Sequence, residues 1–438
     1  LDIDTVAGWV ADLVGLDRDV DDEERVDQIR VLEELKAAAA AAQARVAAAF
    51  DVSQRAVQAA AGVRPGDLGK GIAAQVGLAR RESPTRGAQH LGLAKVLVAE
   101  MPHTLDALTT GRLREWRATL LARETATLSR EHRAVVDREL AGDPARLDGL
   151  GDQALAAAAR KIGYRLDPHA AVRRARRCET ERRVTCRPAP DTMAYLTALL
   201  PVKQAVAAHA ALTRAADTAR AAGDPRSRGQ VMADTLVQRV TGQSTADAVP
   251  VSISLLITDR TLLRGDPEPA HLPGHGPIPA GLARDWVTGH HGADADPEVR
   301  VWLRRLYTHP GTGDLIGMDS HARTFPAGLR NFIRLRDGGT CRTPWCDAPI
   351  RHTDHPHPHA AGGPTTATNA QGLCEACNYA KQAPGWHARP DPGRRRHTIT
   401  TTTPTGHHYH STAPPPPGDP PAPPSRLETY FTNLLLTA

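Results

Sequence analysis

The sequence predicts a mainly α-helical protein with a short β element and a small, cysteine-braced domain near its C-terminus. The chain has 438 residues, enough for roughly two to four ordinary domains, and 41% of them are hydrophobic. Aromatic residues make up only 4%, so the cores must be built from Ala, Leu and Val, a composition that favours helices. Four of the six cysteines lie between positions 341 and 377, which sets the C-terminal segment apart.

The longest predicted helix covers residues 21–61, a stretch without Pro or Gly. Val26, Ile29 and Leu32 recur there at helical spacing, and an Ala-rich run follows. Ser129 is a predicted N-cap because an Arg- and Glu-rich helical stretch follows it. The other predicted helices cover residues 90–101, 104–108, 113–128, 130–140, 193–222, 230–241 and about 280–287.

Two stretches of this long region are predicted to be β-strands. Residues 183–187 follow an Arg-rich run, and residues 249–258 contain β-branched residues that alternate at one end. These two stretches supply the short β element of an otherwise helical region.

The charge of the protein is concentrated near the C-terminus. The whole chain carries a formal charge of +5, and residues 330–396, with ten Arg or Lys and five acidic residues, account for all of it. A polyanion partner is therefore expected at this segment. No window approaches the roughly 18 apolar residues that cross a bilayer, and the N-terminus lacks the order of a secretory signal. These features predict a cytoplasmic protein without a membrane partner.

The clustered cysteines have the spacing of a metal site. Cys341 and Cys346 form C-x4-C, and Cys374 and Cys377 form C-x2-C. Each pair supplies two of the four thiolates of a tetrahedron, so the spacing predicts structural zinc rather than two disulfides. Cys178 and Cys186 have no such partners and are interpreted as buried or incidental thiols.

Residues with catalytic potential lie between the two cysteine pairs. Asp354 directly precedes His355, which places a hard oxygen ligand beside an imidazole that could act as a general base. A Gly-Gly-Pro turn at 362–364 lets the chain double back. Asn378 and Lys381 follow Cys377 one helical turn apart; Asn can ligate a metal through its carbonyl oxygen, and Lys can meet phosphate.

The stretch from about 330 to 386 resembles the HNH endonuclease domain. The matching order is D-H, G-G, N and then L-C-x-x-C-N-x-x-K. The resemblance implies a ββα-metal fold around one catalytic divalent metal, braced by a separate zinc. It implies that His355 activates the attacking water, that Asp354 binds the catalytic metal, and that Asn369 holds the loop that positions His355.

Asn378 stands where the family's last His usually serves as the second metal ligand. Asn is a weaker ligand and favours Mg²⁺ or Mn²⁺ over zinc or nickel, and a water-mediated contact is the alternative to direct coordination. Lys381 and Arg351 are candidates for neutralising phosphate, although each could equally be a surface charge.

A second resemblance covers roughly residues 23–386. The order of helices, the R-R-V-T stretch, the G-H-G-P-I-P turn and R-N-F-I-R-L-R at 330–336 are similar to a large actinobacterial family that joins a helical domain of unknown function to an HNH domain. The predicted organisation is an N-terminal extension (1–22), the helical domain (23–325), the HNH domain (326–390), a β-hairpin (391–412) and a Pro-rich disordered tail (413–438).

The leading hypothesis is a metal-dependent HNH endonuclease that hydrolyses DNA, with a structural Zn²⁺ and a catalytic Mg²⁺ or Mn²⁺. Cleavage of both DNA strands by one small site would favour a homodimer. The alternative is a zinc-stabilised nucleic-acid-binding or scaffold protein that does not cut. A third hypothesis is an RNA-directed or toxin-type nuclease.

Overall fold

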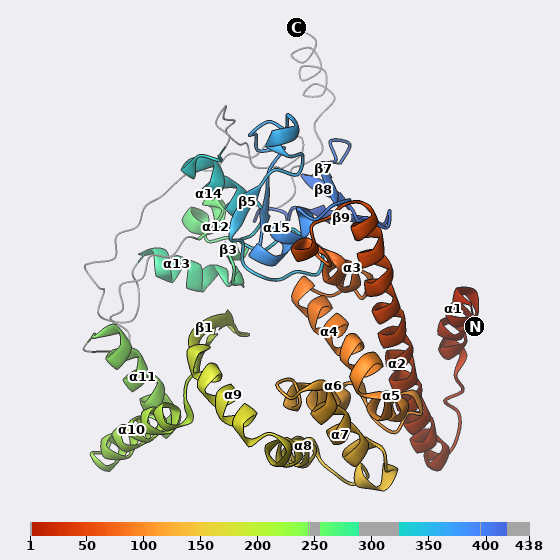
Figure 1. Cartoon of the computed structure of the whole chain (residues 1–438). Coiled ribbons are helices and arrows are strands. Elements are labelled where there is room, and N and C mark those ends of the chain that lie inside the picture. Colours follow the sequence, from red (N-terminus) through yellow and green to blue (C-terminus); the bar gives the residue numbers. More distant parts are fainter. Residues whose placement is uncertain (1, 244, 246–254, 289–323, 395, 418–438) are drawn as a thin grey trace. The chain divides into compact units, whose positions relative to one another are not determined.

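The computed structural model describes residues 2–417 except 244, 246–254, 289–323 and 395. The described chain is mostly helical, with small antiparallel sheets (Figure 1). It divides into two compact units. The first, here called the helical unit, comprises residues 1–69 and 88–176; the second, the C-terminal unit, comprises residues 70–87 and 177–438. Among the described residues, no helix combines the length and the hydrophobicity that a membrane crossing requires.

The helical unit is built around the 39-residue helix α2 (Asp22–Ala60). Its other helices are α1 (Ile3–Asp12), most of α4 (Pro84–Glu100), α5 (Pro102–Thr109), α6 (Glu115–Glu124), α7 (Arg130–Ala141), α8 (Asp152–Leu166) and most of α9 (Pro168–Thr180). Helix α2 packs against α5 and α6, and α8 packs against α6 and α7. The predicted helices are therefore present, with ends that differ by a few residues.

The core of the helical unit is made of small and aliphatic side chains, as the low aromatic content predicted. Ala37, Ala41 and Ala44 lie on one stripe of α2 and let neighbouring helices approach closely. The large fully buried members of this core are Leu97, Met101, Leu108, Leu113, Leu121, Val136 and Leu155.

Polar side chains fix the beginnings of two helices in this unit. Ser129 caps α7, as predicted, by accepting a hydrogen bond from the His132 amide at 3.2 Å. Buried Asp137 on α7 accepts hydrogen bonds from the amides of His103 and Thr104, both at 2.8 Å. A carboxylate of one helix thus satisfies the otherwise unpaired N–H groups at the start of α5.

In the C-terminal unit, β1 (Arg183–Pro188) pairs with β2 (Ala194–Leu199) to form an antiparallel hairpin. The prediction of one helix across 193–222 was therefore wrong in its first part, and α10 spans only Val202–Ala221. Cross-strand contacts such as Arg187 over the Tyr195 ring, at 4.7 Å, outweigh the local helical preference. The helix begins after Pro201, and it packs against α11 (Arg228–Thr241).

The remaining elements of the C-terminal unit are short. They are α3 (Ile72–Ala79), α12 (Asp259–Arg264), β3 (Ala270–Leu272), β4 (Gly276–Ile278), α13 (Ala280–Thr288), α14 (Ala327–Arg336), β5 (His352–Asp354), β6 (Gln371–Leu373), α15 (Glu375–Lys381), β7 (His387–Pro390), β8 (Thr398–Thr402) and β9 (His408–Thr412). The predicted strand at 249–258 lies largely outside the described residues; within them, Leu256 bridges His271. Most of the predicted tail is likewise outside them.

Helix α3 belongs to the C-terminal unit although it lies far from it in sequence. Ala74 and Leu78 pack with Ala383 and Trp386 in one buried cluster. Gly71 precedes α3 with φ +81°, and a Cβ there would lie 2.5 Å from the Trp386 indole nitrogen. The helix therefore closes over the C-terminal segment only because position 71 carries no side chain.

Candidate functional site

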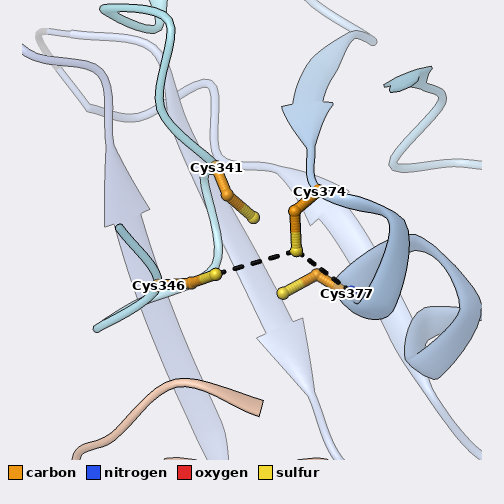
Figure 2. A group of neighbouring side chains, drawn as sticks. All are labelled: Cys341, Cys346, Cys374 and Cys377. Atoms are coloured by element: carbon orange, nitrogen blue, oxygen red, sulfur yellow. Dashed lines mark hydrogen bonds between the residues drawn. The ribbon is translucent and has the colours of Figure 1, made fainter. Parts of the chain in front are cut away.

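The four clustered cysteines come from two parts of the C-terminal unit. Cys341 and Cys346 flank the loop that follows α14, whereas Cys374 is the N-cap of α15 and Cys377 lies in its first turn. All four are buried, their sulfur atoms lie within 4.8 Å of one another, and they point toward a common centre (Figure 2). The Cys346 and Cys374 sulfurs are 3.7 Å apart, close to the ~3.8 Å expected between thiolates around tetrahedral zinc. The cluster could hold a metal ion, as predicted from the spacing.

The electrostatics of this cluster favour a thiolate at Cys374. Hydrogen bonding with the neighbouring sulfur atoms of Cys341, Cys346 and Cys377 lowers the pKa of the Cys374 thiol far below its ordinary value. The backbone N–H of Cys377 also points at the Cys374 sulfur, at 3.4 Å. A metal ligand must be deprotonated, so this sulfur is prepared for a cation.

The loop between Cys341 and Cys346 is tied to the neighbouring strand. The amide of Arg342 donates to the carbonyl of Gly372 at 2.9 Å, and the amide of Cys341 donates to Ala348 at 2.9 Å. Trp345 adopts φ +60°, an uncommon value for a bulky residue, which closes the loop and leaves the ring partly exposed. These bonds hold the first cysteine pair beside the second.

The hairpin of β5 and β6 carries the polar residues between the two cysteine pairs. Its register places Asp354 opposite Gln371 and Thr353 opposite Gly372. A Cβ at Gly372 would lie 2.2 Å from the Ile350 side chain, so any larger residue here would force Ile350 to move. Helices α14 and α15 both contact β5, and the three elements surround one site.

Asp354, at the end of β5, is held by one cation and one amide. The Lys381 ammonium group forms an ion pair with Asp354 Oδ2, and Gln371 Nε2 donates to the same oxygen at 3.1 Å. Lys381 also donates to the carbonyl oxygen of His355. Within the described chain, Asp354 Oδ1 accepts no hydrogen bond, so one carboxylate oxygen is open to a ligand.

The His355 imidazole lies next to Asp354 in a partly buried position. Its Nε2 is 2.9 Å from the Thr365 hydroxyl, and its ring centroid is 4.2 Å from that of Phe325. Burial lowers the pKa of His355 although Asp354 opposes this effect. The neutral imidazole, which is the form that can accept a proton, is therefore favoured.

Asn369 fastens the loop that follows His355. Its Nδ2 donates to the carbonyls of His357 and Pro364 at 3.0 and 2.8 Å, and its Oδ1 accepts from the His357 amide at 3.0 Å. Gly363 packs directly against this amide group, because a Cβ at position 363 would lie only 2.9 Å from Asn369 Nδ2. The buried amide thus closes both ends of the loop that contains the Gly-Gly turn.

Asn378 lies in the first half of α15 and is only 8% exposed. Its Oδ1 has no hydrogen-bond partner in the described part of the chain. A buried amide oxygen without a partner costs free energy unless a ligand satisfies it. The donor set of Asn378 Oδ1 and Asp354 Oδ1 has the oxygen chemistry that hard divalent cations prefer.

The two basic residues predicted to meet phosphate are placed differently. Arg351 is exposed just before β5, and its backbone amide donates to the Leu373 carbonyl at 2.9 Å. The Lys381 side chain is only 12% exposed and is already bonded to Asp354. Arg351 directly precedes β5, and Lys381 reaches the same strand from α15. Only the guanidinium of Arg351 faces solvent.

Two arginines that contributed to the predicted basic surface are buried. Asp337, fully buried, accepts from Arg336 Nε and from Arg342 Nη1, each at 2.8 Å. Burial opposes ionisation of Asp337, but the two guanidinium groups outweigh it and lower its pKa. Neither arginine is available to a polyanion, so counting charge along the sequence overstated the basic surface of this segment.

Comparison with known protein families identifies the larger part of the chain. A family profile described as "Domain of unknown function (DUF222)" matches residues 69–337, more than half of the sequence. The chain belongs to the DUF222 family. Neither the curated proteins nor the solved structures include a match.

The match confirms the predicted resemblance for the helical part of the chain, although no biochemical role comes with it. The DUF222 region ends at Asp337, before the cysteine cluster and the polar site. Asp337 nevertheless contacts the C-terminal segment that follows the DUF222 region, because its Oδ2 accepts a hydrogen bond from the Gly372 amide at 2.8 Å. The DUF222 region and the C-terminal segment therefore share one buried ion cluster.

The residues that hold the site were not recognised from the sequence of this DUF222 protein. Thr365 bonds His355, Gln371 bonds Asp354, and Phe325 packs on the imidazole. Gln371 could have been found by pairing the hairpin around the Gly-Gly turn, which puts it opposite Asp354. Phe325 comes from before α14, and no local signal relates it to His355.

The buried cluster predicts that acid destabilises the C-terminal unit. His397 Nδ1 is 3.3 Å from Arg342 Nη1, and burial, assisted by Arg336, lowers the pKa of His397 to about 4. An unfolded His binds its proton near pH 6.5, so between about pH 6.5 and about pH 4 the unfolded state holds more protons. The free energy of unfolding should therefore fall with decreasing pH, by up to about 1.4 kcal/mol per pH unit.

Thermal unfolding of wild type and His397→Gln, followed over this pH range, would measure the effect. Glutamine can accept from Arg342 and donate to the Thr368 carbonyl, which His397 Nε2 contacts at 2.9 Å. The variant should show a flatter dependence of the unfolding temperature on pH. Parallel curves for the two proteins would contradict the assignment.

Proposed function

We propose that this protein is a metal-dependent endonuclease of the HNH type that hydrolyses phosphodiester bonds in DNA. One arrangement supports this proposal above all: His355 and Asp354 end one strand of a hairpin, Asn369 fastens the loop behind them, and Asn378 lies on the following helix with an unpartnered oxygen. The two short strands β5 and β6, with helix α15 beside the four-cysteine cluster, support the proposal of a ββα-metal arrangement.

In this proposal His355 is the general base. If its Nε2–H donates to Thr365, as the 2.9 Å separation allows, Nδ1 carries the lone pair that accepts a proton from water. The hydroxyl of Thr365 and the ring of Phe325 fix the orientation of the imidazole. Asn369 acts at a distance by holding the backbone at His357, two residues beyond the base.

The catalytic metal fits the donor set of this chain. Asp354 and Asn378 would hold Mg²⁺ or Mn²⁺ through the free Oδ1 of Asp354 and the buried, unpartnered Oδ1 of Asn378, a hard-ligand set that suits these ions better than zinc. When bound, such a cation supplies positive charge that stabilises the phosphate oxygens during cleavage. Lys381 pairs with the Asp354 carboxylate and anchors it to the backbone at His355.

The remaining charges have separate roles. The exposed guanidinium of Arg351 is free to neutralise a phosphate of the DNA next to the hairpin. Zn²⁺ held by the four cysteines would brace α15, which carries both Asn378 and Lys381. Because one such site cleaves one strand, a cut through both strands would require two copies of the chain.

A plasmid-nicking assay tests the proposal. Supercoiled DNA should be nicked in the presence of Mg²⁺ or Mn²⁺ and remain intact when only the tightly bound zinc is present. Wild-type protein that keeps its zinc but leaves the plasmid intact with either ion would contradict the nuclease assignment. That outcome would favour the alternative, a zinc-stabilised nucleic-acid-binding protein.

A further inference from the structure

The three-stranded sheet of β7, β8 and β9 has one face that the proposed active site does not use. Its register places His387 and His408 on either side of Thr402, and Arg389 and His410 on either side of Thr400. Directly opposed residues of an antiparallel pair point to the same side of a sheet. His387, Arg389, His408 and His410 therefore share one face, here called the His/Arg face, and all four are exposed.

The hydrogen bonds on the His/Arg face turn its donors outward. The Thr402 hydroxyl lies 3.0 Å from His408 Nδ1, and the Thr400 hydroxyl lies 3.0 Å from His410 Nδ1. A threonine that donates to Nδ1 leaves the proton on Nε2, at the outer edge of the ring. With this tautomer at both rings, the imidazole N–H groups of His408 and His410 point away from the sheet.

Within the three strands, no acidic residue balances this face. The three strands contain neither Asp nor Glu, and Arg389 has no ion pair within the described residues. The nearest carboxylate along the chain, Asp391, is already paired with Arg394 at 3.3 Å. The His/Arg face consequently offers donors without carboxylates, which favours an anion that accepts hydrogen bonds.

The other face of the sheet is already covered. Ile399 is 1% exposed, and Tyr409 packs against the cluster formed by α3 and Trp386. Ser411 on the same side bonds the buried Arg342. Since this side anchors the sheet to the C-terminal unit, a ligand can approach only the His/Arg face.

We infer that the His/Arg face binds the phosphate backbone of DNA and so helps to dock the substrate of the nuclease. The inference rests on the proposed function for the identity of the polyanion. The two rows of the face are two residues apart along each strand, about 7 Å, a spacing similar to that of successive phosphates in one DNA strand. Contacts of this kind position DNA without reading its sequence.

Binding of a short fluorescein-labelled DNA duplex, without added Mg²⁺ or Mn²⁺ and over a range of salt concentrations, tests this inference. Arg389→Gln should weaken binding about threefold and reduce the slope of log K against log salt by about 0.9. Adding His387→Gln and His410→Gln should weaken binding further. Arg260→Gln removes the same charge from an exposed Arg that is paired with Asp266, and it should bind as wild type.

Unchanged affinity and salt slope in the triple variant, or no DNA binding by wild type, would overturn the inference. So would equal binding of a labelled poly-glutamate peptide or stronger binding of single-stranded RNA, because either result identifies another polyanion. The plasmid-nicking assay distinguishes failure of this inference from failure of the proposed function. If wild type binds DNA through the His/Arg face but never nicks it, only the nuclease assignment is contradicted. If wild type nicks DNA but the triple variant binds DNA as tightly as wild type, only the docking face is contradicted.

Discussion

Replacing His355 with Ala should reduce metal-dependent nicking by about 10²–10⁴-fold, the usual contribution of a positioned general base. The expected loss follows from the role proposed for the neutral imidazole, whose protonation burial disfavours. The fold should persist, because His355 is only partly buried and its main polar partner is the Thr365 hydroxyl. Nicking rate, zinc content and unfolding temperature would be measured on the same preparation.

Two further variants make this result specific. His355→Gln can still bond Thr365 but cannot take a proton at neutral pH, so it should be as inactive as the Ala variant. His357→Ala removes an exposed imidazole whose backbone, rather than side chain, is bonded by Asn369, and it should remain active. A His355→Gln protein that nicks at the wild-type rate would show that another residue activates the water.

Replacing Cys374 with Ser should release the structural metal and destabilise the C-terminal unit by several kcal/mol, since metal binding contributes directly to folding in such sites. Cys374 is also the N-cap of α15, but serine is itself a good N-cap, so the cap is preserved. The loss of stability would therefore report the metal site. Zinc content and thermal unfolding are the measurements.

Cys178→Ser is the matched control, because Cys178 is exposed and lies outside the cluster. This variant should keep its zinc and its unfolding temperature. A chelator should lower the unfolding temperature of wild type while leaving that of Cys374→Ser unchanged. A Cys374→Ser protein that retained zinc and full stability would contradict the structural-metal assignment.

The two predictions differ in how much of their basis could be seen in the sequence. The spacing of Cys341, Cys346, Cys374 and Cys377 was sufficient to predict the cluster, because short pairs on tight turns leave few other geometries. The arrangement around His355 was less accessible. Its neighbours Thr365 and Phe325 lie ten and thirty residues away in the sequence, and only the folded chain brings them to the imidazole.

Charge was the property that the sequence represented least well. Three basic residues of the segment 330–396 form ion pairs with carboxylates inside the C-terminal unit: Arg336, Arg342 and Lys381. A one-dimensional count does not distinguish a buried ion pair from a solvated side chain. The His/Arg face illustrates the converse, because its residues come from two strands, β7 and β9, and are brought to one surface only by strand register.

By itself, the sequence determined the helical character of the N-terminal region, the cysteine cluster and the identity of the polar residues between the cysteine pairs. These features depend on local spacing, which helical periodicity and short ligand loops express directly. The tertiary structure alone decided that residues 194–199 form a strand, that Gly71 and α3 close over Trp386, and that Lys381 bonds Asp354. Gly71 and Lys381 have partners distant in the chain, and residues 194–199 depend on pairing with the preceding strand β1. The free energy of such contacts outweighs local preference.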